Sequence, residues 1–176
     1  MALDLGNLLQ QYLGGSQTAN AGRAYDDFDQ VAQNAPRSAM AQGVTEALRS
    51  DRTPPFAQMV SQLFDKGDPT QRADMLNQLM RGIGPGLLSS VAGGALGNLF
   101  GGNNNNSNAP ATITPEQAAA MTPEQVKQLA EEAEKENPSI IDRMGDFYAE
   151  NPTLVKTIGG AALAIVLGRV AQGMQR

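Results

Sequence analysis

Carboxylates are the residues of this chain best suited to chemistry, because its 176 residues include no histidine and no cysteine. Thiol nucleophiles, imidazole general bases, disulfides, zinc fingers and thiolate-bound clusters are therefore excluded, which leaves Asp, Glu, Lys, Tyr, Ser and Thr. The sequence also contains no phosphate-binding loop, dinucleotide fingerprint or serine nucleophile elbow. We predict a protein that is not an enzyme and that uses no cofactor.

Three aspartates, Asp26, Asp27 and Asp29, come nearest to the pattern of a metal site. They lack the glycine turn and the terminal glutamate of a calcium loop, and side chains at i, i+1 and i+3 of a helix do not point in one direction. We interpret them as a solvated helix start and predict no metal site. Four glutamates are assigned to a solvent-exposed face by the same argument: Glu131, Glu132, Glu134 and Glu136.

Two tyrosines, Tyr12 and Tyr148, lie within apolar stripes. Aromatic side chains in such stripes usually fill a core and keep the hydroxyl in contact with water. We expect this arrangement for both rather than a catalytic role.

The formal net charge of −5 is unevenly distributed along the chain. Residues 116–150 are strongly acidic, whereas residues 151–176 contain basic residues and no acid. No cluster of Lys and Arg is present to contact phosphates, so we predict no nucleic-acid partner. The N-terminus lacks the basic start of a secretory signal and carries Asp4, which favours a cytoplasmic location, with contact to the inner face of a membrane left open.

Apolar periodicity predicts an all-α protein with an N-terminal helical bundle and a C-terminal three-helix module. Residues 1–35 are expected to form one short helix and a weakly ordered lead. Residues 36–100 contain clear helical stripes joined by short turns, which is typical of a compact bundle. Asp68 before Pro69 marks the start of one of these helices.

The last helix predicted in the bundle is rich in Gly, Ala and Leu and lies within an uncharged run. Its large apolar residues form one stripe, and a neighbouring strip carries almost no side-chain bulk. Because glycine weakens a helix by about 1 kcal/mol per position, such a strip indicates close packing against another helix or a lipid surface. We name it the small-residue strip, and it consists of Gly86, Ser90, Gly93, Gly97 and Gly101.

Residues 101–113 are rich in Asn and Gly and are predicted to be a linker. In the module that follows, residues 114–176, capping boxes begin at Thr114 and Thr122, and Asn-Pro pairs at 137–138 and 151–152 predict two further helix starts. The final helix should run from Pro152 towards Gln172.

The final helix is apolar on nearly all sides between Lys156 and Arg169, and this feature has two interpretations. Twelve apolar residues reach only about 18 Å, short of a bilayer core of roughly 30 Å, which favours a central core helix clasped by the two preceding helices. A tilted membrane anchor with snorkelling Lys156 and Arg169 is the alternative. Both interpretations assign the contact to one set of residues: Ile158, Gly160, Leu163, Ile165, Val166 and Leu167.

The same segment, with Phe147-Tyr-Ala-Glu-Asn-Pro152, Gly159-Gly160 and Gly168-Arg169, resembles the C-terminal tail of ElaB/YqjD-like bacterial proteins. That resemblance implies inner-membrane anchoring and ribosome association, although Lys156 lies inside the anchor here. The Leu- and Gly-rich opening of the chain resembles small YidB-like bacterial proteins.

The sequence as a whole predicts a non-catalytic bacterial-type protein that acts by helix–helix association, as an assembly or membrane-peripheral scaffold. Its partner would be a second copy of the chain or another helical protein, with a membrane surface as a further contact. A soluble protein-binding adaptor is the alternative, followed by a carboxylate-only enzyme and a membrane-lytic protein.

Overall fold

Side-chain caps fix where several helices begin, as the sequence predicts. In the computed structural model, which describes residues 5–13, 22–83 and 112–175, capping boxes form at Asp68, Thr114 and Thr122. The Gln71 amide donates a hydrogen bond of 2.9 Å to the Asp68 carboxylate, and the Asp68 amide donates one of 3.1 Å to the Gln71 side chain. A proline follows each cap at the first helical position, where its missing N–H has no helical partner to lose.

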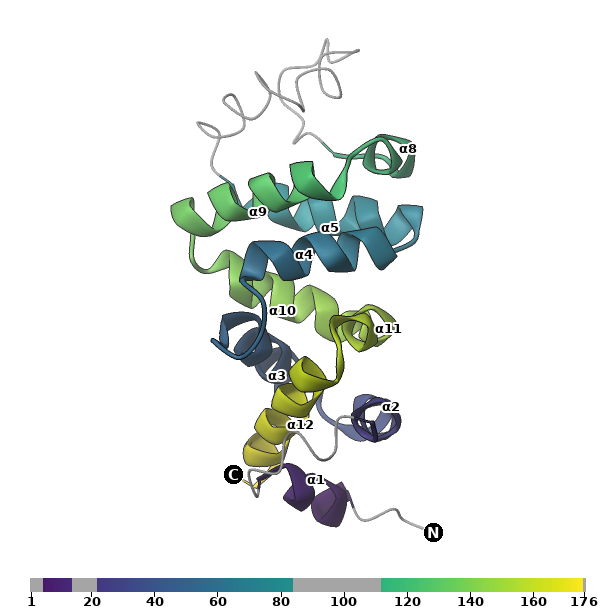
Figure 1. Ribbon diagram of the computed structural model, residues 1–176, viewed down its shortest axis with the longest axis vertical. Helices are drawn as coiled ribbons and strands as arrows, with labels where there is room; N and C mark the ends of the chain where they lie inside the picture. Colours follow the sequence, from purple (N-terminus) through teal and green to yellow (C-terminus); the bar gives the residue numbers. More distant parts are fainter. Residues whose placement is uncertain (1–4, 14–21, 84–111, 176) are drawn as a thin grey trace.

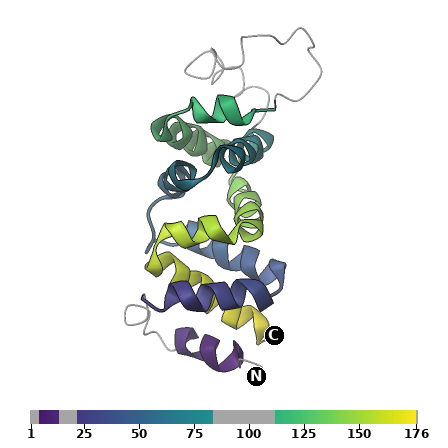
Figure 2. The ribbon, with the colours of Figure 1, turned by 90° about the vertical axis from the view of Figure 1, so that its right-hand side faces the viewer.

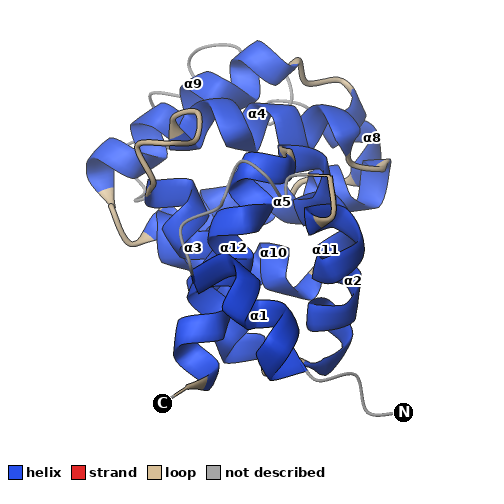
Figure 3. Ribbon diagram, turned by 60° about the horizontal axis from the view of Figure 1, so that its bottom comes forward, coloured by secondary structure: helices blue, strands red, loops and turns tan. Residues whose placement is uncertain are grey.

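Every regular element in the described ranges is a helix, which confirms the all-α class (Figure 3). The elements are, in chain order, α1 (Leu5–Leu13), α2 (Ala24–Asn34), α3 (Arg37–Arg49), α4 (Phe56–Lys66), α5 (Pro69–Gly82), α8 (Pro115–Ala119), α9 (Pro123–Glu136), α10 (Ile140–Glu150), α11 (Pro152–Val155), the 3-10 turn η1 (Lys156–Ile158) and α12 (Gly160–Met174).

The helices form two groups that are stacked along the long axis of the molecule (Figures 1 and 2). One group holds α4, α5, α8 and α9, and the other holds α1, α2, α3 and α12. Helix α10 lies between the groups, where it contacts α3 on one side and α5 on the other. Because α9 packs on α4 and α12 packs on α3, each group combines helices from both ends of the sequence.

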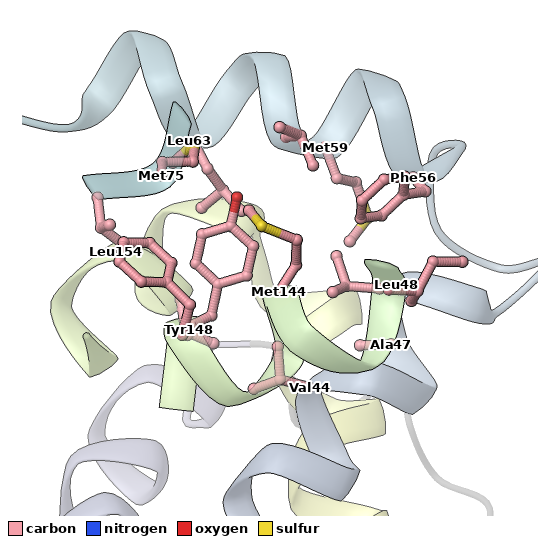
Figure 4. Packing of buried hydrophobic residues seen from close by; sticks show 14 of the residues in the cluster. Val44, Ala47, Leu48, Phe56, Met59, Leu63, Met75, Met144, Tyr148 and Leu154 are labelled. Atoms are coloured by element: carbon pink, nitrogen blue, oxygen red, sulfur yellow. The ribbon is translucent and has the colours of Figure 1, made fainter. Parts of the chain in front are cut away.

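One hydrophobic core runs through both groups, from Leu9 to Ala171. Figure 4 shows Met144 and Tyr148 of α10 between side chains of α3, such as Val44, and side chains of α4 and α5, such as Leu63 and Met75. In the ranges that the structure describes, no polar or charged residue other than tyrosine is buried. The fold is therefore stabilised mainly by apolar packing and not by buried ion pairs.

The predicted division into a bundle of residues 36–100 and a separate module of residues 114–176 does not describe this packing. Helices α9, α10 and α12 pack more extensively against α3 and α4 than against one another. The buried residues of the later helices, such as Leu129 of α9 and Leu163 of α12, belong to the same hydrophobic core as those of α3 and α4. Ile113, at the end of the predicted linker, is itself buried, and its amide donates a hydrogen bond of 2.7 Å to Asn77. Linker residues 101–111 lie outside the described ranges.

Helix α2 corrects the expectation of a weakly ordered lead before residue 36. Its 11 residues are rich in polar side chains, yet Ala24, Phe28 and Val31 are fully buried. This face packs against α12, a contact that local sequence cannot reveal because the two helices are more than 120 residues apart.

The single final helix predicted from Pro152 to Gln172 is broken into three parts: α11, η1 and α12. The break falls at Gly159, which has φ +100° and ψ 158°, a conformation that is essentially restricted to glycine. A smaller difference concerns α10, which begins at Ile140 and not at Pro138. Asn137 ends α9, and its side chain accepts a hydrogen bond of 3.2 Å from the Ser139 amide in the turn between the helices.

Candidate interaction groove

The three aspartates of α2 separate into different roles and form no site. Asp26 is exposed, Asp27 accepts a hydrogen bond of 2.6 Å from the Tyr12 hydroxyl, and Asp29 pairs with Lys156 at 2.5 Å. They are thus less purely solvated than predicted, because two of them connect α2 to other parts of the chain. Within the described ranges no group of three acidic side chains is placed to hold a metal ion.

The two tyrosines predicted in the core are both buried, but the Tyr148 hydroxyl is buried too and does not contact water as expected. Tyr12 donates its hydrogen bond to Asp27, and burial, followed by that bond, raises the pKa of Tyr12. Tyr148 is fully buried, its hydroxyl has no hydrogen-bond partner among the residues that the structure describes, and burial raises its pKa well above the usual value of about 10. Neither hydroxyl is poised as a base or nucleophile near neutral pH.

Helix α12 places most of the predicted membrane or core residues in the core. Leu163, Val166 and Leu167 are fully buried, while Ile158 and Ile165 are partly buried against the same cluster and Gly160 is half-buried. The helix packs mainly against α3, α1 and α2, and not against the two preceding helices that the core interpretation predicts.

Lys156 and Arg169, the charged residues at the two ends of the predicted anchor, both form side-chain contacts within the protein. Lys156 forms the ion pair with Asp29, and the exposed Arg169 donates a hydrogen bond of 3.1 Å to Gln172. In the described part of the chain, no helix combines the length and the apolar character needed to cross a membrane.

The predicted small-residue strip, from Gly86 to Gly101, lies outside the described residues. Close packing occurs instead at two glycines that the sequence reasoning missed. A Cβ on Gly43 would lie 2.8 Å from the Val166 carbonyl oxygen, and one on Gly145 would collide with the Thr45 side chain. Both glycines interrupt strong helical stripes without ending them, which is the signal that could have identified them.

These two glycine contacts press α10 and α12 against opposite flanks of α3 and leave a hollow over the face of α3 between them. The hollow has a volume of about 360 Å³, and a second hollow of about 230 Å³ adjoins it and shares Gln42 and Arg169. Figure 1 shows α3 between α10 and α12. We call the combined surface the α3 groove; it is lined by Ser38, Ala41, Gln42, Thr45, Glu46 and Arg49 of α3, Asp142 and Asp146 of α10, and Arg169, Gln172 and Gly173 of α12.

The α3 groove carries charges of both signs. Arg49 and Asp142 pair across its end at 2.9 Å. Glu46 and Asp146 form no ion pair with any described residue, and Arg169 bonds only to the neutral Gln172. Three carboxylates and two guanidinium groups give the lining a net charge of −1. Such a surface offers ion pairs and hydrogen bonds to a bound chain.

No protein-family model, curated protein or solved structure matches this chain.

Proposed function

We propose that this protein is a non-catalytic interaction protein that acts by helix–helix association and holds a helical segment of a partner chain in the α3 groove. The observation that carries the proposal is the groove itself, because it leaves one face of a central helix uncovered while two other helices enclose its flanks. This corresponds to the adaptor, which the sequence offers as the alternative to an assembly or membrane-peripheral scaffold.

The directions of the surrounding helices favour a helical occupant. Arg37 pairs with Glu150 and Arg49 pairs with Asp142, so α3 and α10 run antiparallel. Gly43 lies against Val166, and Gly173 lies nearest Ala39, so α12 is also antiparallel to α3. The floor from Ser38 to Arg49 spans about 16 Å at the usual helical rise, enough for about three turns of a third neighbouring helix.

The polarity of the groove favours a reversible contact rather than a permanent one. Its floor and walls carry charged and amide side chains, whereas permanent interfaces resemble a hydrophobic core cut in half. A proposal of membrane contact through α12 has no comparable support, because the apolar residues of that helix pack against α1, α2 and α3.

Site-specific photocrosslinking tests this function. A benzophenone amino acid replaces the exposed Gln42 on the groove floor, and a matched protein carries it at the exposed Gln128 on α9. We expect irradiation in native cells to give a discrete protein adduct from position 42 and none of that mass from position 128. No adduct from position 42, or the same adduct from both positions, would contradict the proposal.

Self-association through the small-residue strip is the second candidate. It rests on the sequence pattern of small residues at helical spacing, which permits two helix backbones to approach closely. The chain leaves α5 after Gly82 and is joined to it again at Ile113, which exchanges two hydrogen bonds with Asn77. We expect the protein to sediment as an oligomer that the double substitution Gly93→Leu, Gly97→Leu dissociates, since added side chains separate closely packed backbones. A monomeric wild-type protein would exclude this candidate.

A further inference from the structure

The geometry of the α3 groove points to one class of occupant: a helical segment that places a lysine or arginine side chain between Glu46 and Asp146. This inference rests on the proposed function. This inference deepens the proposed function by specifying the charge that the partner presents and the wall of the groove that receives it.

The position of the two carboxylates follows from the tightest contact between α3 and α10. Gly145 approaches Thr45 so closely that a single added carbon would collide with it. Glu46 and Asp146 are the next residues along the two helices, and both line the same hollow. Two rigid backbones in direct contact therefore bring one carboxylate from the floor and one from the wall to the same part of the groove.

Of the three carboxylates that line the α3 groove, these two have no ion-pair partner among the described residues. Arg49, the basic residue nearest along the floor, is engaged with Asp142 at 2.9 Å. Neither Glu46 nor Asp146 has an ion-pair partner among the described residues, and both are exposed. A single cationic group bound there would cancel the net charge of −1 in the lining, which is the electrostatic complementarity that directs a partner to its site.

The opposite wall gives the occupant a polarity. Arg169 projects from α12 into both hollows, and its described bond is to the uncharged Gln172. A helix in the groove thus meets acids on its α10 side and a guanidinium group on its α12 side. If that helix turned about its axis, its basic side chain would face Arg169 and its acidic side chain would face Glu46 and Asp146, and both pairs would repel. The groove therefore favours one orientation of the bound helix as well as one charge.

A polypeptide fits this surface better than a small cation. Small-ligand sites bury most of their ligand, whereas this hollow is open to solvent and continues into a second one along α12. The two acids also fall short of a metal site, since the described residues contain no group of three ligating acidic side chains.

A peptide titration of the full-length protein tests the inference. The probe is an alanine-rich helical peptide about four turns long, with one central lysine and a glutamate on the neighbouring face; a second peptide replaces the lysine by uncharged norleucine. We expect the lysine peptide to shift the amide resonances of Gln42, Glu46 and Asp146, and the norleucine peptide to bind about tenfold more weakly. Raising the salt concentration should weaken the binding of the lysine peptide more than that of the norleucine peptide, which keeps only the attraction between its glutamate and Arg169.

Matched variants test whether the preference for lysine comes from the two groove carboxylates or from the negative charge of the whole protein. Glu46→Gln with Asp146→Asn removes both unpaired carboxylates, and Asp74→Asn removes an exposed carboxylate on α5 outside the groove. The double variant should lose the roughly tenfold preference for lysine, and Asp74→Asn should keep it. An unchanged preference in the double variant, or no groove shifts with the lysine peptide, would overturn the inference.

The proposed function and this inference can fail separately. If position 42 forms its adduct equally well in the Glu46→Gln, Asp146→Asn protein, the groove binds a partner, but the partner does not need a basic side chain between these two positions. If position 42 forms no adduct, the proposed function fails, and the inference fails with it.

Discussion

The hydroxyl groups of Tyr12 and Tyr148 differ in hydrogen bonding, although both rings lie in the same core. Tyr12 donates to Asp27 across the contact of α1 with α2, whereas Tyr148 points its hydroxyl among apolar side chains that include Leu63 and Leu154 (Figure 4). The sequence predicted that both rings are buried, because their apolar neighbours recur at helical spacing. It could not predict the hydrogen-bond partners, since these depend on how separate helices meet.

This difference predicts opposite effects of removing each hydroxyl. A buried hydroxyl without a partner destabilises the folded state by about 1–3 kcal/mol, so Tyr148→Phe should leave the free energy of unfolding unchanged or raise it by up to about that amount. Tyr12→Phe should lower it by about 1.5–3 kcal/mol, because it removes a hydrogen bond to the charged Asp27 carboxylate. Urea denaturation measures both. A loss of stability in Tyr148→Phe larger than in Tyr12→Phe would contradict this account.

Alkaline pH should destabilise the protein through the same two groups. In the unfolded chain tyrosine ionises near pH 10, whereas burial holds the pKa of Tyr12 and Tyr148 above that value in the folded state. Above about pH 10 unfolding therefore releases protons, and stability falls as the pH rises towards the folded-state pKa. The urea midpoint should drop between pH 9 and pH 11, and it should drop less in Tyr148→Phe. Equal drops in both proteins would show that Tyr148 does not contribute.

At the scale of the elements, local signals located helix starts better than helix interruptions. Asp68, Thr114 and Thr122 cap helices where the sequence predicted, because a capping box is complete within four residues. Gly159 interrupts an apolar run that looks continuous. Glycine weakens a helix by only about 1 kcal/mol, so the contacts of η1 with α4 and of α12 with α3 decide where the chain turns.

Gly159 should accordingly be the glycine of this segment that tolerates alanine least. Its φ of +100° strains any other residue, and we expect Gly159→Ala to lower the free energy of unfolding by about 1–3 kcal/mol. Gly168→Ala is the matched control: it lies within α12, and among the described residues its new Cβ would meet only the Tyr12 carbonyl oxygen, at an ordinary 3.6 Å. That control should gain about 0.5–1 kcal/mol. Thermal unfolding compares the two, and equal effects would contradict the strained geometry.

At the scale of the whole molecule, the two ends of the sequence build one core. The sequence predicted helical stripes within residues 36–100, and α3, α4 and α5 confirm them, but a stripe specifies that a face is buried and not which helix covers it. Close contacts at Gly43 and Gly145 select α12 and α10 as the neighbours of α3, and these contacts also create the groove. The groove was therefore beyond sequence reasoning, even though most of the helices that line it were not.

The most direct test of this account is whether the C-terminal part of the chain folds by itself. Residues 102–176 and residues 1–101 are prepared as separate fragments, and their helicity and thermal unfolding are followed by circular dichroism. Because α9, α10 and α12 bury their apolar faces mainly against α3 and α4, the account predicts that residues 102–176 alone lack a cooperative transition and that mixing the fragments restores it. A cooperative transition in the isolated C-terminal fragment, unchanged when residues 1–101 are added, would contradict the shared core and, with it, the groove that the core creates.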